Sequence, residues 1–361
     1  MDFPALKIKE LVARVPIVQG GMGVGISLSG LSSAVANQGG IGVISAAMIG
    51  LDEPDIVKNP QQAHIRALQK EIRKARSMTA GVLGVNIMVA LRNYADMVKT
   101  SIQEGIDIIF CGAGLPLDLP AYLEKNSRTK LVPIVSSPKA ARILCKKWLS
   151  RFNYLPDGFV VEGPLAGGHL GFKEEELSDP AFSLENLVQG VLEAVRPFEQ
   201  EHQDQMPIIA AGGIYSGQDI NQFLNLGVAG VQLGTRFVAT HECDAHPAFK
   251  QAFIDAREQD LVVIKSPVGM PGRALGNAFL ADVQQGKRKA FKCLYHCIVT
   301  CDYQQSPYCI AAALSNVKKG KMHRGFAFAG QNAYRIESLS SVKELIDSLR
   351  EEYTAACAVC V

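Results

Sequence analysis

The chain has 361 residues, 48% hydrophobic and 20% charged, an ordinary globular composition that can form a large core without disulfide bonds or structural metals. Its net charge of +2 indicates neither a nucleic-acid partner nor an anionic membrane surface. No apolar stretch reaches the ~18 residues of a membrane-spanning helix, and the charged N-terminal segment does not resemble a signal peptide. We therefore expect a cytoplasmic protein with no membrane partner, whose nine cysteines are thiols or ligands.

Short apolar runs rich in β-branched residues recur eight times, and each ends in glycine or another small residue. Near-continuous hydrophobic runs are typical of strands in a parallel sheet that is buried on both faces. The predicted strands cover residues 16–19, 42–45, 83–89, 106–111, 131–136, 158–161, 207–210 and 230–233. Stretches with helical periodicity separate or follow them, at residues 28–38, 60–77, 94–104, 119–126, 138–150, 183–198 and 216–226.

This alternation predicts an α/β fold, specifically a (β/α)₈ TIM barrel. An open, doubly wound sheet is the alternative, but eight units in about 240 residues favour closure. Later residues suggest a polar helix at 240–263, a Pro- and Gly-rich loop at 265–276 and an amphipathic helix at 340–352. We predict a barrel at residues 1–240, a cap with a cysteine-rich segment at 241–325, inserted after the eighth strand, and a C-terminal segment at 326–361 that returns to the barrel.

Glycine turns follow the last two predicted strands, at the barrel end where active sites form. Gly212 and Gly213 follow the seventh strand, and Gly234 and Thr235 follow the eighth. Glycines let backbone N–H groups approach a phosphate closely, and these two loops are the usual phosphate site of such barrels. Turns needed only for folding are the alternative, but two of them at the same end favour phosphate binding.

Other polar or flexible residues follow the remaining strands. Met22, in the Gln-Gly-Gly-Met-Gly turn, could pack against a flat ring or belong to the core. Asn86 and Ser136 could each bond a ligand or a neighbouring loop. His169 stands among glycines after the sixth strand, where bulky core neighbours are missing. Its ordinary pKa suits proton transfer, and we favour that role over a structural histidine bonded to a loop carbonyl.

Together, the segments at residues 16–23, 162–171, 210–214 and 232–237 resemble the nitronate monooxygenase family, formerly called 2-nitropropane dioxygenases, and the similar flavin-dependent enoyl-acyl-carrier-protein reductases. The resemblance implies non-covalent flavin mononucleotide (FMN) in a barrel, with His169 near the flavin, and we take His169 as the catalytic residue from its place in the glycine loop. It implies flavin-ring contacts from Gly21, Met22, Gly23 and Asn86, and neighbours of the ring at Glu162, Gly167, Gly168 and His169. It implies a phosphate end at Gly212, Gly213, Gln232, Leu233, Gly234 and Thr235, and we add Ser136 to the predicted cofactor contacts.

Two features depart from the pattern of that family. Many members carry glutamine where Glu162 stands. Many also carry a lysine in the fifth strand, where this chain reads Val-Pro-Ile-Val-Ser at residues 132–136. The second departure separates this chain from the best-studied nitronate oxidisers.

Four cysteines, Cys293, Cys297, Cys301 and Cys309, are spaced C-x₃-C-x₃-C-x₇-C. On one straight helix the first and third would lie ~12 Å apart, and the spacing matches neither common zinc patterns nor the ferredoxin run. Spacing alone favours a packed, apolar cysteine stripe. However, this segment and residues 162–172 and 264–271 resemble an iron–sulfur branch of the family, which includes an acyl-acyl-carrier-protein dehydrogenase/isomerase of unsaturated fatty-acid biosynthesis. That resemblance implies a [4Fe–4S] cluster on the four cysteines.

Three functions remain open at this point. The first is oxidation of an acidic α-carbon, in an alkyl nitronate or a thioester carried by acyl carrier protein, with O₂ as the flavin oxidant. The second is an NAD(P)H-dependent enoyl reductase, and the third is a non-enzymatic sensor of a phosphorylated ligand. His169 in its glycine loop argues against the third, because packing gives no evident reason for it. The sequence is compatible with a homodimer.

Overall fold

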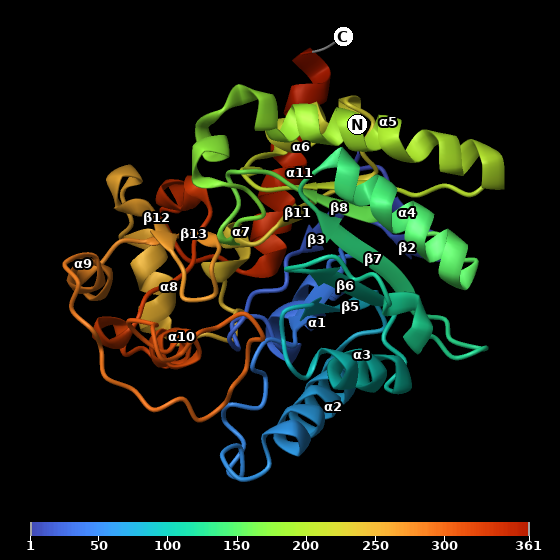
Figure 1. Ribbon diagram of the computed structural model, residues 1–361. Coiled ribbons are helices and arrows are strands. Elements are labelled where there is room, and N and C mark those ends of the chain that lie inside the picture. The colour runs from blue at the N-terminus through green and yellow to red at the C-terminus, as the bar shows by residue number, and fades with distance from the viewer. Residues whose placement is uncertain (1, 360–361) are drawn as a thin grey trace.

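The computed structural model describes residues 2–359, and its centre is a barrel of eight parallel strands (Figure 1). The strands are β3 (Ile17–Gln19), β4 (Gly42–Ser45), β5 (Leu83–Met88), β6 (Ile108–Gly112), β7 (Lys130–Val135), β8 (Phe159–Glu162), β10 (Ile208–Ala211) and β11 (Gly230–Leu233). They pair in the order β3-β11-β10-β8-β7-β6-β5-β4. Backbone bonds from Ile41 N–H to Ile17 O and from Gln19 N–H to Ile41 O, both 2.9 Å, join the two ends of that order. The predicted (β/α)₈ barrel is therefore confirmed.

Side chains alternate between the inside of the barrel and the layer beneath the helices. The interior contains a cluster of fully or almost fully buried residues, Val18, Val43, Ile108, Phe110, Val132, Val160 and Ile209. A hairpin of β1 (Leu6–Ile8) and β2 (Leu11–Ala13) contributes Leu6, Ile8 and Ala13 to the same cluster. The hairpin therefore closes the bottom of the barrel, and the sequence patterns did not reveal it.

Helices cover the outside of the barrel (Figure 1). They are α1 (Ser29–Asn37), α2 (Pro60–Met78), α3 (Tyr94–Gln103), α4 (Pro138–Phe152), α5 (Leu184–His202), α6 (Gly217–Asn225), α7 (Thr235–Val238) and α11 (Val342–Val359). Short 3₁₀ turns lie at η1 (Leu119–Tyr122), η2 (Glu174–Ser178), η3 (Pro180–Phe182), η4 (Glu258–Asp260), η5 (Met322–Arg324) and η6 (Gln331–Arg335). Among the described residues, no helix is both long and apolar enough to cross a bilayer.

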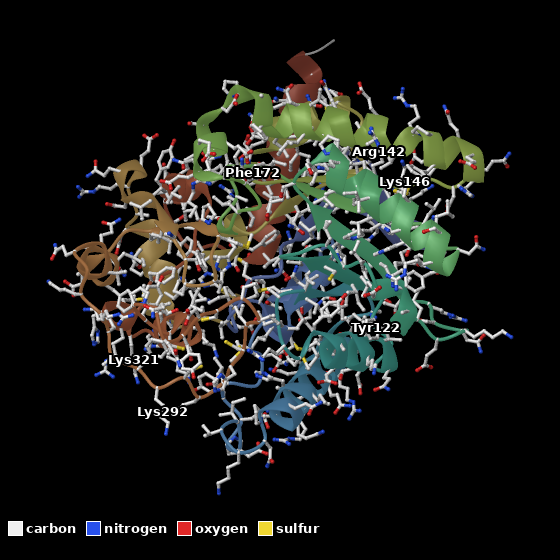
Figure 2. The ribbon with its side chains drawn as sticks, in the orientation of Figure 1. Tyr122, Arg142, Lys146, Phe172, Lys292 and Lys321 are labelled. Atoms are coloured by element: carbon white, nitrogen blue, oxygen red, sulfur yellow. The ribbon has the colours of Figure 1, made fainter. Side chains whose placement is uncertain are left out.

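Helix α4 shows why these segments fold as they do. Ser137 accepts a bond from the Ala140 N–H at 3.2 Å, and Pro138 occupies the first turn, where no N–H partner is needed. Its inner face buries Trp148, whereas Arg142 and Lys146 project outwards (Figure 2). An apolar stripe with charged residues opposite it fixes which face meets the barrel.

The remaining elements form a cap beside the barrel mouth (Figure 1). They are α8 (Pro247–Ile254), β12 (Leu261–Lys265), β13 (Pro271–Leu275), α9 (Ala278–Gln284) and α10 (Ile310–Lys318). The predicted helix at 240–263 is wrong, because α8 covers only part of it and Val262 and Val263 belong to a strand. Those β-branched residues pair with β13, which in turn pairs with β9 (Gly168–His169) from the barrel. The cap sheet therefore includes the histidine loop.

Candidate active site

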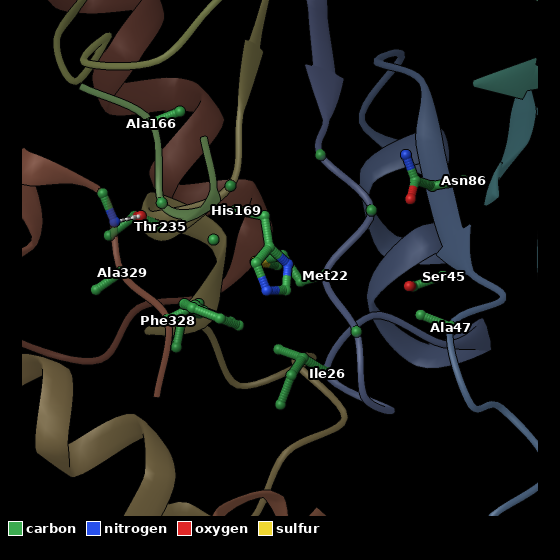
Figure 3. A pocket seen from close by; sticks show the side chains of 18 of the residues that line it. Met22, Ile26, Ser45, Ala47, Asn86, Ala166, His169, Thr235, Phe328 and Ala329 are labelled. Atoms are coloured by element: carbon green, nitrogen blue, oxygen red, sulfur yellow. Dashed lines mark hydrogen bonds between the residues drawn. The ribbon is translucent and has the colours of Figure 1, made fainter. Parts of the chain in front are cut away.

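A cavity of about 310 Å³ lies at the carboxyl ends of the barrel strands, partly beneath the cap (Figure 3). This volume is in the range of small-molecule sites, roughly 300–1,000 Å³. Fourteen of the residues predicted for the flavin site line it: Gly21, Met22, Gly23, Asn86, Glu162, Gly167, Gly168, His169, Gly212, Gly213, Gln232, Leu233, Gly234 and Thr235. Ser136 is not among the lining residues; β7 ends at Val135, and Ile134 is the residue of that strand that faces the cavity.

The two glycine turns form one side of the cavity. Gly212 and Gly213 have φ angles of +97° and +89°, in the left-handed region that favours glycine. A Cβ on Gly212 would also lie 3.0 Å from the Gly163 carbonyl oxygen. At Gly234 a Cβ would meet nothing closer than the Met22 sulfur at 3.7 Å, so the backbone faces open space there. These turns fit a phosphate ester approached by main-chain groups.

A segment that the sequence patterns missed crosses these turns, and we call residues 329–332 the C-terminal strap. The Gly330 N–H donates to Thr235 Oγ1 at 2.9 Å, and the Asn332 side-chain amide donates to the Gly213 carbonyl at 2.5 Å. The Gln331 N–H donates to the Leu165 carbonyl at 3.0 Å. The strap therefore ties both glycine turns to the histidine loop. Because Thr235 accepts from the strap, its own hydroxyl proton stays available to a phosphate oxygen.

Polar side chains at the upper ends of the strands form the floor of the cavity. Ser45, Asn86, Glu162 and Gln232 all line it. The buried Ser45 hydroxyl has no hydrogen-bond partner within the described structure, so it is available to the polar edge of a ligand. A Cβ on Gly21 would lie 2.2 Å from Asn86 Cβ, so only glycine lets this turn pass over that amide. A flat ring with polar edges fits this floor.

Burial raises the pKa of the Glu162 carboxyl to about 7. The cause is the loss of water around the charged form. A glutamic acid at this position therefore differs in charge from the family's glutamine only above about pH 7.

His169 projects into the cavity from β9 (Figure 3). Its Nε2 atom lies 2.8 Å from the hydroxyl of Ser266, which belongs to the cap loop between β12 and β13. Its ring lies 4.9 Å from the ring of Phe328, at an interplanar angle of 61°. Burial lowers the pKa of His169 to about 4, so the imidazole is neutral near pH 7. A neutral imidazole whose Nε2 atom is hydrogen-bonded to Ser266 can accept a proton at Nδ1.

Arg273 holds the loop that carries this histidine. Its buried guanidinium donates to the carbonyl oxygens of Pro164 and Ala166, the latter at 2.9 Å. Neither Ser266 nor Arg273 was identified from the sequence. The only available signal was the family-like run at residues 264–271, which contains Ser266 but says nothing of its contact.

The four spaced cysteines line a second, smaller cavity of about 80 Å³ in the cap. Burial, reinforced by the neighbouring thiols, raises the pKa of Cys297 to about 12. Within residues 2–359, no three Cys, His, Asp or Glu side chains are arranged to hold a metal ion. The thiols converge on one cavity, but their arrangement does not form a ligand set.

The barrel, the two glycine turns and the histidine above the mouth fit a flavin-dependent oxidoreductase. The chain belongs to the nitronate monooxygenase family, whose model matches residues 5–352, and it is an FMN-dependent member of that class. It is 25% identical to a probable nitronate monooxygenase of Bacillus subtilis, over 96% of this chain and 98% of that protein.

Two further relatives bear on the site. Over 273 residues the chain is 30% identical to (3aS,4S,5R,7aS)-5-hydroxy-7a-methyl-1-oxo-octahydro-1H-indene-4-carboxyl-CoA dehydrogenase of Mycobacterium tuberculosis. That match covers 76% of this chain and 66% of the relative. The structure of FabK from Thermotoga maritima superposes with a TM-score of 0.74 at 28% identity, covering 96% of this chain and 94% of FabK. The chain therefore shares the fold of its barrel and cap with that structure.

Proposed function

We propose that this protein oxidises an acyl thioester at its acidic α-carbon, with FMN as the electron acceptor. The observation that carries this proposal is a group of apolar residues in the cavity lining, contributed by the cap and by the barrel segments that pack against it, which we call the apolar arm. Its residues are Val24, Met48, Met88, Leu91, Ile298, Ile310, Ala311 and Leu314. None of these eight side chains is charged, and they suit an acyl chain, whereas a small alkyl nitronate would need only the barrel mouth.

The Mycobacterium tuberculosis relative supports this choice, because that protein is a carboxyl-CoA dehydrogenase, which acts on a coenzyme A thioester. The head of the thioester would lie in the barrel mouth and its chain in the arm. The carrier could be coenzyme A or an acyl carrier protein.

The residues of the mouth fit FMN. Backbone groups of Gly212, Gly213, Gly234 and Thr235 would hold its phosphate, and the floor that contains Asn86 and Glu162 would face its ring. FMN, when bound, would accept two electrons, and O₂ would reoxidise the reduced flavin.

His169 then has a defined role as general base. In the tautomer that permits this, its Nε2–H donates to Ser266 Oγ and its Nδ1 lone pair receives the α-proton of the thioester. The bond to Ser266 orients the ring and stabilises the imidazolium that results. Loss of the α-proton to His169, and of a hydride from the β-carbon to the acceptor, leaves an α,β-unsaturated thioester.

We also propose that Cys293, Cys297, Cys301 and Cys309 hold a [4Fe–4S] cluster, as the resemblance to the iron–sulfur branch implies. Their convergence on one cavity supports this proposal, although they would have to draw closer together. We assign no step of the reaction to the cluster. Four irons per chain and a broad absorbance near roughly 400 nm in anaerobically purified protein would establish it. Iron-free protein that keeps its flavin would reject it.

The test of substrate class is anaerobic flavin bleaching. Purified protein is mixed separately with a saturated acyl thioester, with propyl nitronate and with NADH. Fastest bleaching by the thioester supports the proposed function, and fastest bleaching by the nitronate would contradict it. Fastest bleaching by NADH favours the enoyl reductase, the second candidate, for which the similarity to FabK is the supporting observation.

A further inference from the structure

The apolar arm ends at a wall that it shares with the cysteine cavity. Three residues, Cys297, Ile298 and Ile310, line both cavities. Ile298 and Ile310 are buried, at 8% and 5% exposure, so their side chains fill the space between the cavities rather than project into solvent. A chain that enters the arm from the barrel mouth therefore meets these two isoleucines.

We propose that Ile298 sets the maximum length of the acyl chain that this enzyme accepts. This inference rests on the proposed function, since it concerns the chain of the same thioester. It makes Ile298 a specificity-determining residue that contacts the far end of the chain and is remote from the reacting carbons.

The backbone around Ile298 is fixed, which a length-setting wall requires. The Val299 N–H donates to the Ala90 carbonyl at 2.9 Å, and the Arg92 N–H donates to the Cys297 carbonyl at 3.1 Å. These bonds form an antiparallel bridge between Ile298 and Leu91, in the loop after β5. The cysteine segment is therefore clamped to the barrel at the position where it closes the arm.

The side chain of Ile298 is held as well. It belongs to one apolar cluster with Leu91, Ile310 and Phe326. Other residues of the arm belong to a second cluster, in which Ala311 of α10 packs with Val24 and Met48. Since residues of the arm belong to two packed clusters, its length is set by side-chain volume rather than by a mobile loop.

The wall predicts a chain-length profile. Each methylene buried in the arm strengthens thioester binding about four-fold, from ~0.8 kcal/mol per CH₂, until the chain reaches Ile298. Chains longer than this bind no more tightly, or clash with the Ile298 side chain. Replacing Ile298 by alanine shortens this wall, and the volume of the lost side-chain carbons becomes available to the chain without use of the cysteine cavity, which the proposed cluster would occupy.

The experiment measures binding and turnover separately. Dissociation constants for saturated acyl-CoA thioesters, from hexanoyl to tetradecanoyl, are measured by calorimetry on the FMN-loaded protein without oxygen. Rates of flavin bleaching are then measured with the same series. The variants are Ile298→Ala and the matched control Val299→Ala, whose side chain is 60% exposed and lies outside the arm. Ile298→Val is included in case the larger truncation fails to fold.

In wild type and Val299→Ala, affinity should rise with chain length and then stop at the same carbon number. In Ile298→Ala the rise should continue for about two further carbons, a gain of about four-fold for each carbon and about sixteen-fold for both. Ile298→Val should extend it by about one carbon. In Val299→Ala, binding and bleaching by every chain length should match wild type.

An Ile298→Ala profile identical to wild type would overturn this inference and leave the proposed function intact. A profile that shifts equally in Val299→Ala would also overturn it, because a general disturbance of the loop would then be the cause. If no thioester of any length binds wild type or bleaches its flavin, the proposed function itself fails.

Discussion

His169 and Glu162 both line the cavity, and the structure reverses the usual order of their pKa values. Burial lowers the pKa of His169 to about 4 and raises that of Glu162 to about 7. A pH dependence near neutrality would ordinarily be assigned to a histidine. We expect it to belong to Glu162, so that Glu162→Gln removes it. Above its pKa the carboxylate opposes electrons arriving at the flavin, and wild-type bleaching should therefore slow as the pH rises through about 7.

The expected loss of bleaching rate at low pH follows from the pKa of His169. A base with a pKa of about 4 is still about nine-tenths neutral at about pH 5. An imidazole with the ordinary pKa of about 6.5 would be only about 3% neutral at that pH. In Glu162→Gln, bleaching at about pH 5 should therefore stay within about two-fold of its value at about pH 8, whereas an ordinary histidine would cause a loss of roughly thirty-fold.

The assay is stopped-flow bleaching of the flavin by a saturated acyl thioester, without oxygen, from about pH 5 to about pH 9. Wild type, Glu162→Gln and His169→Gln are compared at saturating thioester. His169→Gln should lose about 10²–10⁴-fold in rate at every pH while it keeps its flavin. The reasoning is refuted if Glu162→Gln shows a midpoint near 6.5 and a loss above ten-fold at low pH, or if His169→Gln bleaches at the wild-type rate.

Three further outcomes follow from the cofactor side and from a buried histidine. Gly212→Ala should weaken FMN binding by about ten-fold or more in equilibrium dialysis, because its φ is +97° and a Cβ would crowd the Gly163 carbonyl; unchanged affinity would contradict the strain argument. Thr235→Val should speed flavin release several-fold, because the Gly330 N–H loses its acceptor. The release rate is measured by flavin fluorescence, and a rate equal to wild type would show that the strap does not retain flavin. His64, a buried acceptor for an N–H, has its pKa lowered to about 4, so the unfolded chain binds its proton first. Stability should fall as the pH drops from about 6.5 towards 4, by at most about 3 kcal/mol, and urea unfolding of His64→Gln should show a correspondingly smaller acid loss.

Much of the barrel was determined by the sequence alone. A strand buried on both faces must be almost continuously apolar, so the eight runs identify themselves. Parallel strands then bring all their carboxyl ends to one side, whatever the details of packing. For that reason fourteen predicted residues, including Asn86, Glu162 and Gly212, line one cavity, and their individual roles stay predictions. Ser136 lies just past the end of its strand, where the in-and-out alternation of strand side chains no longer fixes which way the side chain points.

The tertiary structure alone decided how the cap meets this mouth. Ser266 reaches His169 across 97 positions of sequence, and Gly330 reaches Thr235 across 95. No local period encodes such contacts, because they depend on how two separately packed units fit together. The same holds for the strand at Leu261–Lys265, whose β-branched residues pair with β13, which in turn pairs with the histidine loop. The shared wall that includes Ile298 is a further product of that docking, since its residues line two cavities that no sequence pattern places side by side.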